Sequence, residues 1–191
     1  MQVMLERGSA KKLKGCIEID DSYLGAKRVS GKRGRGAKGK TPFVAAVEKR
    51  DGNPVRIKLS RVKGFRSNEI ERWSRHHLEP GTKVVSDGLA CFNAVKKAGC
   101  CHEPHIVGGG KQAVEHSAFK WVNTVLGNIK NSLKGTYHAF AKKHTARYLA
   151  EFQYRFNRRF ELENMVPRLA YAAVRTPPMQ ARLLSLAEKE W

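Results

Sequence analysis

The chain has 191 residues, of which 41% are hydrophobic. This length fits one ordinary domain with a hydrophobic core, and the composition argues against disorder throughout the chain. Lys and Arg outnumber Asp and Glu by 37 to 17, which gives a formal net charge of +20 and an isoelectric point near 10.2. This excess favours a polyanionic partner, with a ribosome-associated or merely basic protein as the alternative. No apolar run approaches the roughly 20 residues that span a bilayer, and the first 15 residues lack the apolar core of a secretory signal, so neither a membrane nor a secreted protein is expected.

The first predicted elements are a basic helix and a strand. Residues 1–14 favour the helix, and residues 16–23 favour the strand, in which Ile17 and Ile19 alternate with Glu18 and Asp20. The alternation predicts that Asp20 faces away from the apolar pair. Residues 26–40 are rich in Gly, Lys and Arg with almost no apolar content, which indicates a flexible loop.

Two more strands and a helix are predicted next. Residues 41–49 and 55–62 have strand patterns, and the sequence DGNP between them marks a turn. Two consecutive hairpins predict an antiparallel meander of three strands. The following segment predicts a helix with Ser67 as its N-cap and with Ile70 and Trp73 on its apolar face.

The rest of the chain, from residue 84 onward, is predicted to contain two short strands and several helices. Val84 and Val85 form a short strand that leads to Asp87, a short helix follows at 91–100, and a further strand is predicted at 105–107. Later helices are predicted at about 114–134, at about 142–160, and near the C-terminus beyond the two prolines at 177 and 178. The order βββαβαβα followed by helices predicts a mixed α/β sheet covered by helices.

Two acidic residues occupy strand positions that permit a metal site. Asp20 lies midway along the first predicted strand and Asp87 at the end of the fourth. If these strands are neighbours, both carboxylates can approach one cation, which relieves their mutual repulsion. Taken alone, Asp87 before Gly88 is more simply a cap of the following helix, and Asp20 beside Asp21 is compatible with an ordinary acid at a strand end.

A later helix carries two more polar side chains on one face. Asn123 and Lys130 are seven residues apart, close to two helical turns. An amide oxygen can ligate Mg²⁺ beside carboxylates, and an ammonium group can bind a phosphate or stabilise developing charge. Taken separately, a hydrogen-bonded Asn and a solvated Lys are the more common roles. Oxygen ligands from distant segments are what a magnesium-dependent nuclease or strand-transfer enzyme requires.

The blocks that surround these residues follow one another in a recognisable order: IEIDDSYLGAKRVSGKRGRGAKGKTPFVAAV, VVSDGLACFNAV, WVNTVLGNIKNSLKGTYHAF and RYLAEFQYRFNRRFEL. From about residue 13 to residue 175, the chain resembles the transposase domain of bacterial insertion sequences of the ISXO-like type. The resemblance implies an RNase H-like fold and a catalytic set of two Asp, then Glu or Asn, then Lys two turns later. That set falls on Asp20, Asp87, Asn123 and Lys130, and Asp21 is a lesser candidate where many relatives have Glu.

The resemblance also implies a chemistry and its partners. Asp20, Asp87 and Asn123 would hold Mg²⁺ or Mn²⁺, and the enzyme would cleave DNA at the ends of the insertion sequence and transfer the freed 3'-hydroxyl to target DNA. Its location would be the cytoplasm, on the nucleoid when bound to DNA, and cutting paired ends makes a homodimer plausible. The alternatives are a structure-specific nuclease on the same fold and a non-catalytic DNA-binding remnant of a transposase.

The chain departs from the family pattern in two places. Relatives carry an N-terminal zinc ribbon with paired CxxC motifs, whereas this sequence is expected to begin just before the catalytic domain. The usual Gly-Gly after the first motif is Gly25-Ala26 here. The expected organisation is a remnant of a basic linker at 1–14, the catalytic domain at 15–160 and a helical extension at 161–191.

Two basic segments are candidates for contact with DNA phosphates. One is the Gly-rich loop, for which the alternative is a disordered loop that contributes only general electrostatic attraction to DNA. The other is the helix near residue 155, whose arginines either contact phosphates or form a solvated face. The candidate residues are Lys27, Arg28, Lys32, Arg33, Arg35, Lys38, Lys40, Arg155, Arg158 and Arg159. Aromatic side chains nearby, such as Phe152, Phe156 and Trp121, are more often core than base-stacking platforms.

The four cysteines predict neither a disulfide framework nor a clear metal site. They contain no CxxC pair, so a reducing compartment is expected. Cys100, Cys101, His102 and His105 are zinc-ligand types, but adjacent cysteines seldom share a tetrahedral ion and no second pair exists. Structural or incidental thiols are the preferred interpretation.

Overall fold

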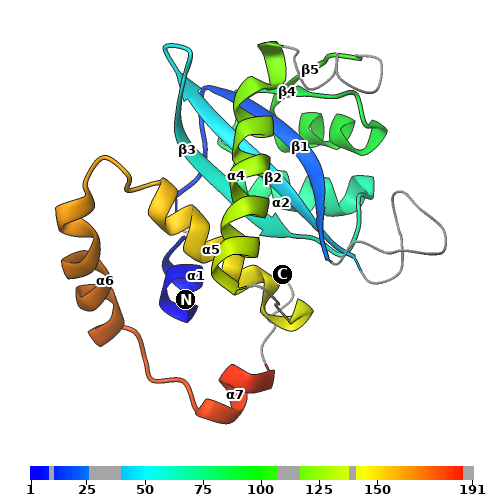
Figure 1. The fold of residues 1–191 in the computed structure, drawn as a ribbon. Coiled ribbons are helices and arrows are strands. Elements are labelled where there is room, and N and C mark those ends of the chain that lie inside the picture. The colour runs from blue at the N-terminus through cyan, green and yellow to red at the C-terminus, as the bar shows by residue number, and fades with distance from the viewer. Residues whose placement is uncertain (9–10, 26–39, 107–116, 138–140, 187–191) are drawn as a thin grey trace.

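The computed structural model describes residues 1–8, 11–25, 40–106, 117–137 and 141–186. Within them lies a five-stranded sheet with the strand order β3-β2-β1-β4-β5 (Figure 1). The strands are β1 (Cys16–Leu24), β2 (Thr41–Arg50), β3 (Asn53–Arg61), β4 (Lys83–Ser86) and β5 (Cys101–Pro104). Neighbours among β1, β2 and β3 are antiparallel, whereas β4 is parallel to β1 and β5 is parallel to β4. The predicted meander and mixed sheet are confirmed.

A two-residue turn joins β2 to β3. Asp51 and Gly52 both have positive φ, at 51° and 76°. Positive φ at both central positions is typical of a type I′ turn, whose twist matches that of the flanking strands. The Asp-Gly sequence allows this backbone because both residue types tolerate the left-handed region better than most.

Different helices bury the two faces of the sheet. Successive residues of β2 alternate between the faces: Val44 and Ala46 pack on one, and Phe43, Ala45 and Val47 on the other. This two-sided burial explains the nearly continuous apolar run of β2. The first face is covered by α2 (Ser67–His77) and the 3₁₀ helix η1 (Ala90–Ala98), and the second by α4 (Lys120–Tyr137) and α5 (Thr145–Phe156).

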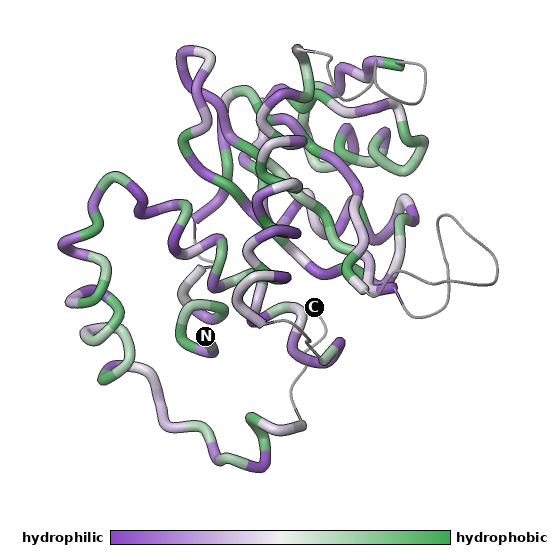
Figure 2. The backbone as a smooth tube through the Cα atoms, viewed as in Figure 1, coloured by the Kyte–Doolittle hydropathy of each residue, from purple (hydrophilic) through white to green (hydrophobic). Residues whose placement is uncertain are grey.

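Shorter helices complete the described chain. They are α1 (Gln2–Gly8), η2 (Ser117–Phe119), η3 (Lys142–His144), η4 (Leu162–Asn164), α6 (Met165–Val174) and α7 (Ala181–Leu186). Helix α6 is largely hydrophobic and lies away from the sheet (Figures 1 and 2). Its Val166 and Val174 are 72% and 83% exposed. Across the described residues, no helix combines the length and apolar character that crossing a membrane requires.

The predicted helix over residues 1–14 is wrong in its second half. Helix α1 ends at Gly8, and Leu13 instead forms a single parallel bridge with Leu78. The amide of Leu13 donates to the carbonyl of His77 at 2.8 Å, and its carbonyl accepts from Glu79 at 2.9 Å. Leu13 is fully buried, so pairing with the chain that follows α2 extends this segment and places its side chain in the core.

The predicted strand at 105–107 is also misplaced. Strand β5 occupies Cys101–Pro104, residues 105 and 106 have no regular structure, and residue 107 lies outside the described residues. As the edge strand, β5 is half-exposed and lacks the apolar run by which buried strands are identified. Its position comes from the parallel ladder with β4 and from an exposed ion pair between Lys83 and Glu103.

The predicted helix at residue 67 is confirmed, but its predicted cap is not. Ile70 donates its amide to the carbonyl of Arg66 at 3.0 Å, so Arg66 is the N-cap and Ser67 is the first helical residue. No side chain caps this end, although the Asn68 side chain accepts the amide of Glu69 at 2.9 Å. The apolar positions Ile70 and Trp73 are buried as predicted.

Two amide side chains, one in the last turn of α5 and one just after it, cover the open edge of β3. The Gln153 Oε1 atom accepts the amide of Leu59 at 2.8 Å, and the Asn157 Oδ1 atom accepts that of Ile57 at 2.7 Å. Asn157 also donates through Nδ2 to the carbonyl of Ile57 at 3.0 Å. An edge strand presents unpaired backbone groups that invite association with other chains. Helix α5 therefore satisfies this edge with side chains spaced one helical turn apart.

Replacing Gln153 with Ala should lower the free energy of unfolding by about 1–3 kcal/mol, because the buried amide of Leu59 loses its acceptor. Urea denaturation measures the change. The matched control is Asn128→Ala, which removes an exposed amide from α4 and should change the free energy of unfolding by less than about 0.5 kcal/mol. Equal effects of the two substitutions would contradict the edge-covering role.

Candidate active site

An acidic group lies where β1 and β4 run side by side. Ile19 is opposite Ser86 in the parallel register, so Asp20 and Asp87 follow at the same level of the sheet. One carboxylate oxygen from each of Asp20, Asp21 and Asp87 lies within 4.8 Å of the others, and this is the one such group of acidic, His or Cys side chains among the described residues. All three residues are half-buried. The first and fourth strands are therefore neighbours, which is the condition on which the predicted approach of Asp20 to Asp87 depended.

Strand alternation decides the direction of these side chains. Ile17 and Ile19 pack on the face covered by α2, while the Glu18 carboxylate contacts the start of α4. Asp20 shares the face of Glu18, as the period of two requires. Asp21 alternates to the other face, but its amide donates to Asp20 Oδ1 at 2.8 Å and its carboxylate remains within the acidic group.

The loop after β4 holds Asp87 through local contacts. Asp87 Oδ1 accepts the amide of Leu89 at 3.1 Å, which closes a local turn ahead of η1. The buried Ser86 hydroxyl contacts His102 Nε2 of β5 at 2.8 Å and accepts the amide of Gly88 at 3.4 Å. The simpler interpretation of Asp87 as a cap of the following helix is wrong, because Leu89 is the N-cap of η1 and no side chain caps that end. Asp87 instead belongs to the acidic group.

Helix α4 carries Asn123 and Lys130 on one border of its buried stripe. The stripe consists of Val122, Val125, Leu126, Ile129 and Leu133. At about 100° per residue, Asn123 and Lys130 lie roughly 90° from its centre on one side, and Trp121 lies about as far on the other. Trp121 Nε1 donates to the carbonyl of Gly52 at 2.7 Å, so the border with Asn123 and Lys130 is turned away from the β2–β3 hairpin. Asn123 is half-buried and Lys130 is exposed.

Most of the predicted loop contacts to DNA lie outside the described residues. These are Lys27, Arg28, Lys32, Arg33, Arg35 and Lys38. Lys40, immediately before β2, is described and exposed.

The arginines near the end of α5 have partners within the chain. Arg155 forms an ion pair with Glu151 and donates to Ser132 Oγ at 3.1 Å. The Arg158 guanidinium lies 3.8 Å from the centre of the Tyr154 ring.

Arg159 is more fully engaged than its neighbours. It donates to the carbonyls of Pro54 and Phe156 and lies against the ring of Phe156. Burial lowers its pKa. Phe152 and Phe156 pack against the core on the α4 side, as predicted for these aromatics.

The Cys- and His-containing segment around β5 takes part in several separate contacts. His102 Nδ1 contacts Asn93 Oδ1 at 3.0 Å, and His105 pairs with Glu103 at 2.9 Å. Cys100 is buried, and its thiol donates to the carbonyl of Glu79 at 3.7 Å, whereas Cys101 is exposed.

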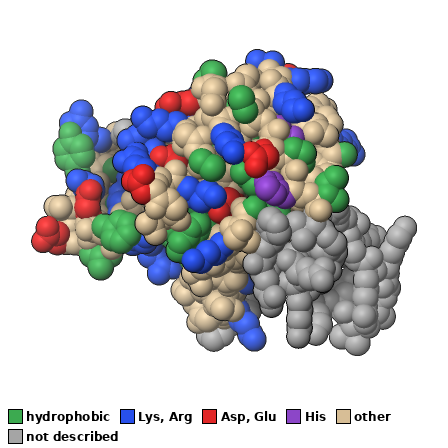
Figure 3. All heavy atoms as spheres, turned by 90° about the horizontal axis from the view of Figure 1, so that it is seen from above, with side chains coloured by type: hydrophobic (Ala, Val, Ile, Leu, Met, Phe, Trp, Pro, Cys, Tyr) green, Lys and Arg blue, Asp and Glu red, His purple; other side chains and the backbone are tan. Residues whose placement is uncertain are grey.

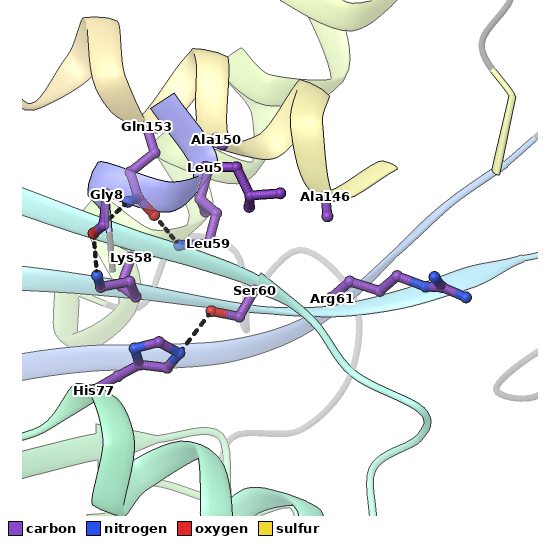
Figure 4. A pocket seen from close by; sticks show the side chains of 10 residues that line it. All are labelled: Leu5, Gly8, Lys58, Leu59, Ser60, Arg61, His77, Ala146, Ala150 and Gln153. Atoms are coloured by element: carbon purple, nitrogen blue, oxygen red, sulfur yellow. Dashed lines mark hydrogen bonds between the residues drawn. The ribbon is translucent and has the colours of Figure 1, made fainter. Parts of the chain in front are cut away.

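A small hollow lies between β3, α1, α2 and α5 (Figure 4). Lys58 donates to the carbonyl of Gly8 at 2.6 Å, and His77 Nε2 contacts the Ser60 hydroxyl at 3.3 Å. His77 Nδ1 is buried and has no hydrogen-bond partner among the described residues. Burial, with the charge of Arg56 second, lowers the pKa of Lys58 to about 8. These groups connect α1 and α2 to β3, and none of them belongs to the acidic group.

Two residues near the acidic group were underestimated from the sequence. Asp21 was the lesser candidate, yet its carboxylate is a full member of the group. Glu18 was expected only as the polar partner in an alternating strand, but its side chain is fully buried against α4. For Glu18 the signal is the polar face of β1, which it shares with Asp20, but only the packing of α4 shows that this face is covered.

A mixed sheet with helices on both faces and clustered acids on neighbouring parallel strands defines a class of enzymes that cut or join phosphodiester bonds on an RNase H-like fold. Residues 12–157 match the model of the ISXO2-like transposase domain, and the chain belongs to that family. It is thus a DNA transposase, with DNA as its partner. Enzymes of this kind typically use a divalent metal ion, for which the acidic group offers oxygen ligands. A comparison with curated protein sequences found no match.

Acid should destabilise the fold partly through His77. Burial is the main cause that lowers the pKa of His77 to about 3, with the charge of Lys58 second. Between about pH 6.5 and 3 the unfolded chain therefore binds a proton at this residue that the folded chain does not, so His77 should reduce the free energy of unfolding by about 1.4 kcal/mol for each unit that the pH falls. Urea denaturation at several pH values measures this slope.

The exposed neighbour His76 provides the control for that experiment. His77→Gln should make the acid slope shallower by about one proton, whereas His76→Gln should leave it nearly as in the wild type. Titration of the wild-type imidazoles by NMR gives the same answer independently of both variants. A His77 pKa near 6.5 in the folded protein would contradict the assignment.

Proposed function

We propose that this transposase cleaves phosphodiester bonds at the ends of its insertion sequence and joins the freed 3'-hydroxyl to target DNA, with Mg²⁺ or Mn²⁺ held by Asp20, Asp87 and Asn123. The observation that carries the proposal is the approach of Asp20, Asp21 and Asp87 to within 4.8 Å of one another in a chain of the ISXO2-like family. Like charges at this distance repel, and a divalent cation between them removes the repulsion.

The donor set fits a hard cation. Mg²⁺ prefers carboxylate and amide oxygens to nitrogen or sulfur, and the acidic group contains oxygen ligands alone. Asn123 is the proposed third ligand because it is half-buried on the border of α4 that is turned away from the β2–β3 hairpin. Asp21 is the competing candidate, since its carboxylate already lies in the group.

The side chains contribute position and charge. When bound, the metal supplies a Lewis acid that lowers the barrier to displacement at phosphorus. Asp20 and Asp87 hold its charge at the level where β1 and β4 meet, and Lys130, exposed on the same helix border as Asn123, binds a phosphate of the DNA. The mechanism needs no protein nucleophile, because water and the 3'-hydroxyl serve in the two steps.

DNA binding rests on a distributed positive surface in this proposal. Lys and Arg side chains recur across the face seen in Figure 3, and the whole chain has a net charge of +20. Exposed Lys40 lies immediately before β2 and follows the basic residues 26–39, which lie outside the described residues and are proposed to bind DNA phosphates. Arg155 and Arg158 add charge near the end of α5, whereas Arg159 is mainly occupied by backbone carbonyls. A homodimer would present two such sites to the two ends of the element.

Strand transfer with an oligonucleotide that carries the element end tests the reaction. Asp20→Asn and Asp87→Asn should each lower the rate of product formation by about 100-fold or more, because each removes a charged ligand while keeping the side-chain shape. Glu69→Gln on α2, on the other face of the sheet, should have little effect.

Each other outcome of this experiment has a definite meaning. Equal product from all these proteins would overturn the catalytic assignment. Cleavage without joining would favour the structure-specific nuclease, and DNA binding without either step would favour the non-catalytic remnant.

Asn123→Asp tests the third ligand. The substitution should tighten Mn²⁺ binding by about tenfold or more, because it adds a negative charge to the ligand set. Calorimetric titration of the free protein measures the affinity. Asn128→Asp adds the same charge to the exposed face of α4 and should change the affinity far less. If Asp21→Asn weakens binding while Asn123→Asp has no effect, Asp21 is the third ligand instead.

A further inference from the structure

Glu18 joins the central strand to the start of α4. Its side chain is fully buried, and its Oε2 atom accepts the amide of Trp121 at 2.9 Å and that of Val122 at 2.8 Å. Helix α4 begins at Lys120, so these are amides of its first turn, which have no acceptor within the helix. In Figure 1, α4 crosses the sheet in front of β1 and β2. The contact therefore links a strand and a helix about 100 residues apart.

The buried charge of Glu18 is compensated from two directions. Its Oε1 atom lies 3.0 Å from the Nζ atom of Lys49 on β2, whose side chain is 20% exposed. The N-terminal end of α4 carries the positive end of the helix dipole, which also favours an anion. A buried carboxylate without such partners would be strongly destabilising. The negative charge is thus held at the helix end by both contacts.

A second contact limits rotation of the same helix end. Trp121 Nε1 donates to the carbonyl of Gly52 in the β2–β3 turn at 2.7 Å. Glu18 binds the first turn of α4 to β1, and Trp121 binds one border of α4 to the β2–β3 hairpin. Together they determine the direction in which the next residues of α4 project, including Asn123.

We propose that Glu18 is a positioning residue for the metal site. Asp20 lies two residues further along the same face of β1, and Asn123 lies next to Val122, whose amide Glu18 accepts. One side chain thus sets the separation between two proposed ligands that come from different elements. This inference rests on the proposed function, because it assigns Glu18 to the geometry of that site. Groups that orient metal ligands typically change metal affinity by about 10–100-fold when they are removed.

The chain offers a matched buried glutamate whose partners lie outside α4. Glu48 of β2 is 2% exposed, accepts the amide of Lys14 at 3.4 Å and lies 3.8 Å from Arg56. Replacement of either glutamate by Gln removes a buried charge without changing its shape. A purely structural role would therefore give both variants similar effects, confined to stability.

The experiment compares Glu18→Gln and Glu48→Gln with the wild-type protein by calorimetric titration with Mn²⁺ and by urea denaturation. Both variants should be less stable. Glu18→Gln should also weaken Mn²⁺ binding by about tenfold or more, whereas Glu48→Gln should leave the affinity within about twofold of the wild type. Equal affinities in all three folded proteins would overturn the proposal, as would equal weakening in both variants.

Two further measurements keep the outcome decisive. If Glu18→Gln does not fold, Glu18→Asp retains the charge but withdraws it by one methylene, and the same loss of affinity is expected. Asp20→Asn is titrated alongside. If the wild type and Asp20→Asn bind Mn²⁺ equally, the proposed function itself fails. If Asp20→Asn abolishes binding and the Glu18 variants do not weaken it, only the positioning role is wrong.

Discussion

The parallel pairing of β1 with β4 is the constraint on which the rest of this transposase depends. Without it, β1 would be the last strand of an antiparallel meander, and Asp20 would not have Asp87, from the loop after β4, as its acidic neighbour. The pairing places β1 between an antiparallel and a parallel partner, and the helices on the two sides of the sheet bury both of its faces. It also places Asp20, which follows Ile19, level with Asp87, which follows Ser86. The acidic group is a direct result of that register.

Polar side chains connect the helices to the sheet at two places. On one face, α4 begins at the buried Glu18 carboxylate, so a strand side chain provides the acceptors for a helix end. At the β3 edge the roles are reversed, because Gln153 of α5 and Asn157, which follows this helix, provide acceptors for strand amides. In both places a polar side chain of one element satisfies the backbone of another. These contacts are directional, so they fix the relative positions of elements that apolar packing alone leaves adjustable.

An element of this structure could be predicted from the sequence where its signal is a local pattern, and could not where it depends on a distant partner. The meander was predictable because alternating strands and an Asp-Gly turn are local patterns, and the spacing of Asn123 and Lys130 follows from helical geometry alone. The position of strand β5 could not be predicted, because a half-exposed edge strand lacks an apolar run. The bridge at Leu13 depends on a partner about 65 residues away, for which no local pattern exists. The approach of Asp20 to Asp87 could be predicted only conditionally, since strand order is a property of the whole sheet.

The separation of β1 and β4 along the chain has a consequence for synthesis on the ribosome. Strands β1 to β3 can emerge and pair while β4 is still unmade, and during that interval the side of β1 that will receive β4 is an open edge. The acidic group does not exist in such a nascent chain, because Asp87 has not yet been joined to Asp20. Helix α4, which begins at Lys120, is translated later still. The protein therefore gathers its carboxylates only after β4 has been made, and a chain that is terminated before β4 would lack the acidic group while keeping the basic segment that precedes β2.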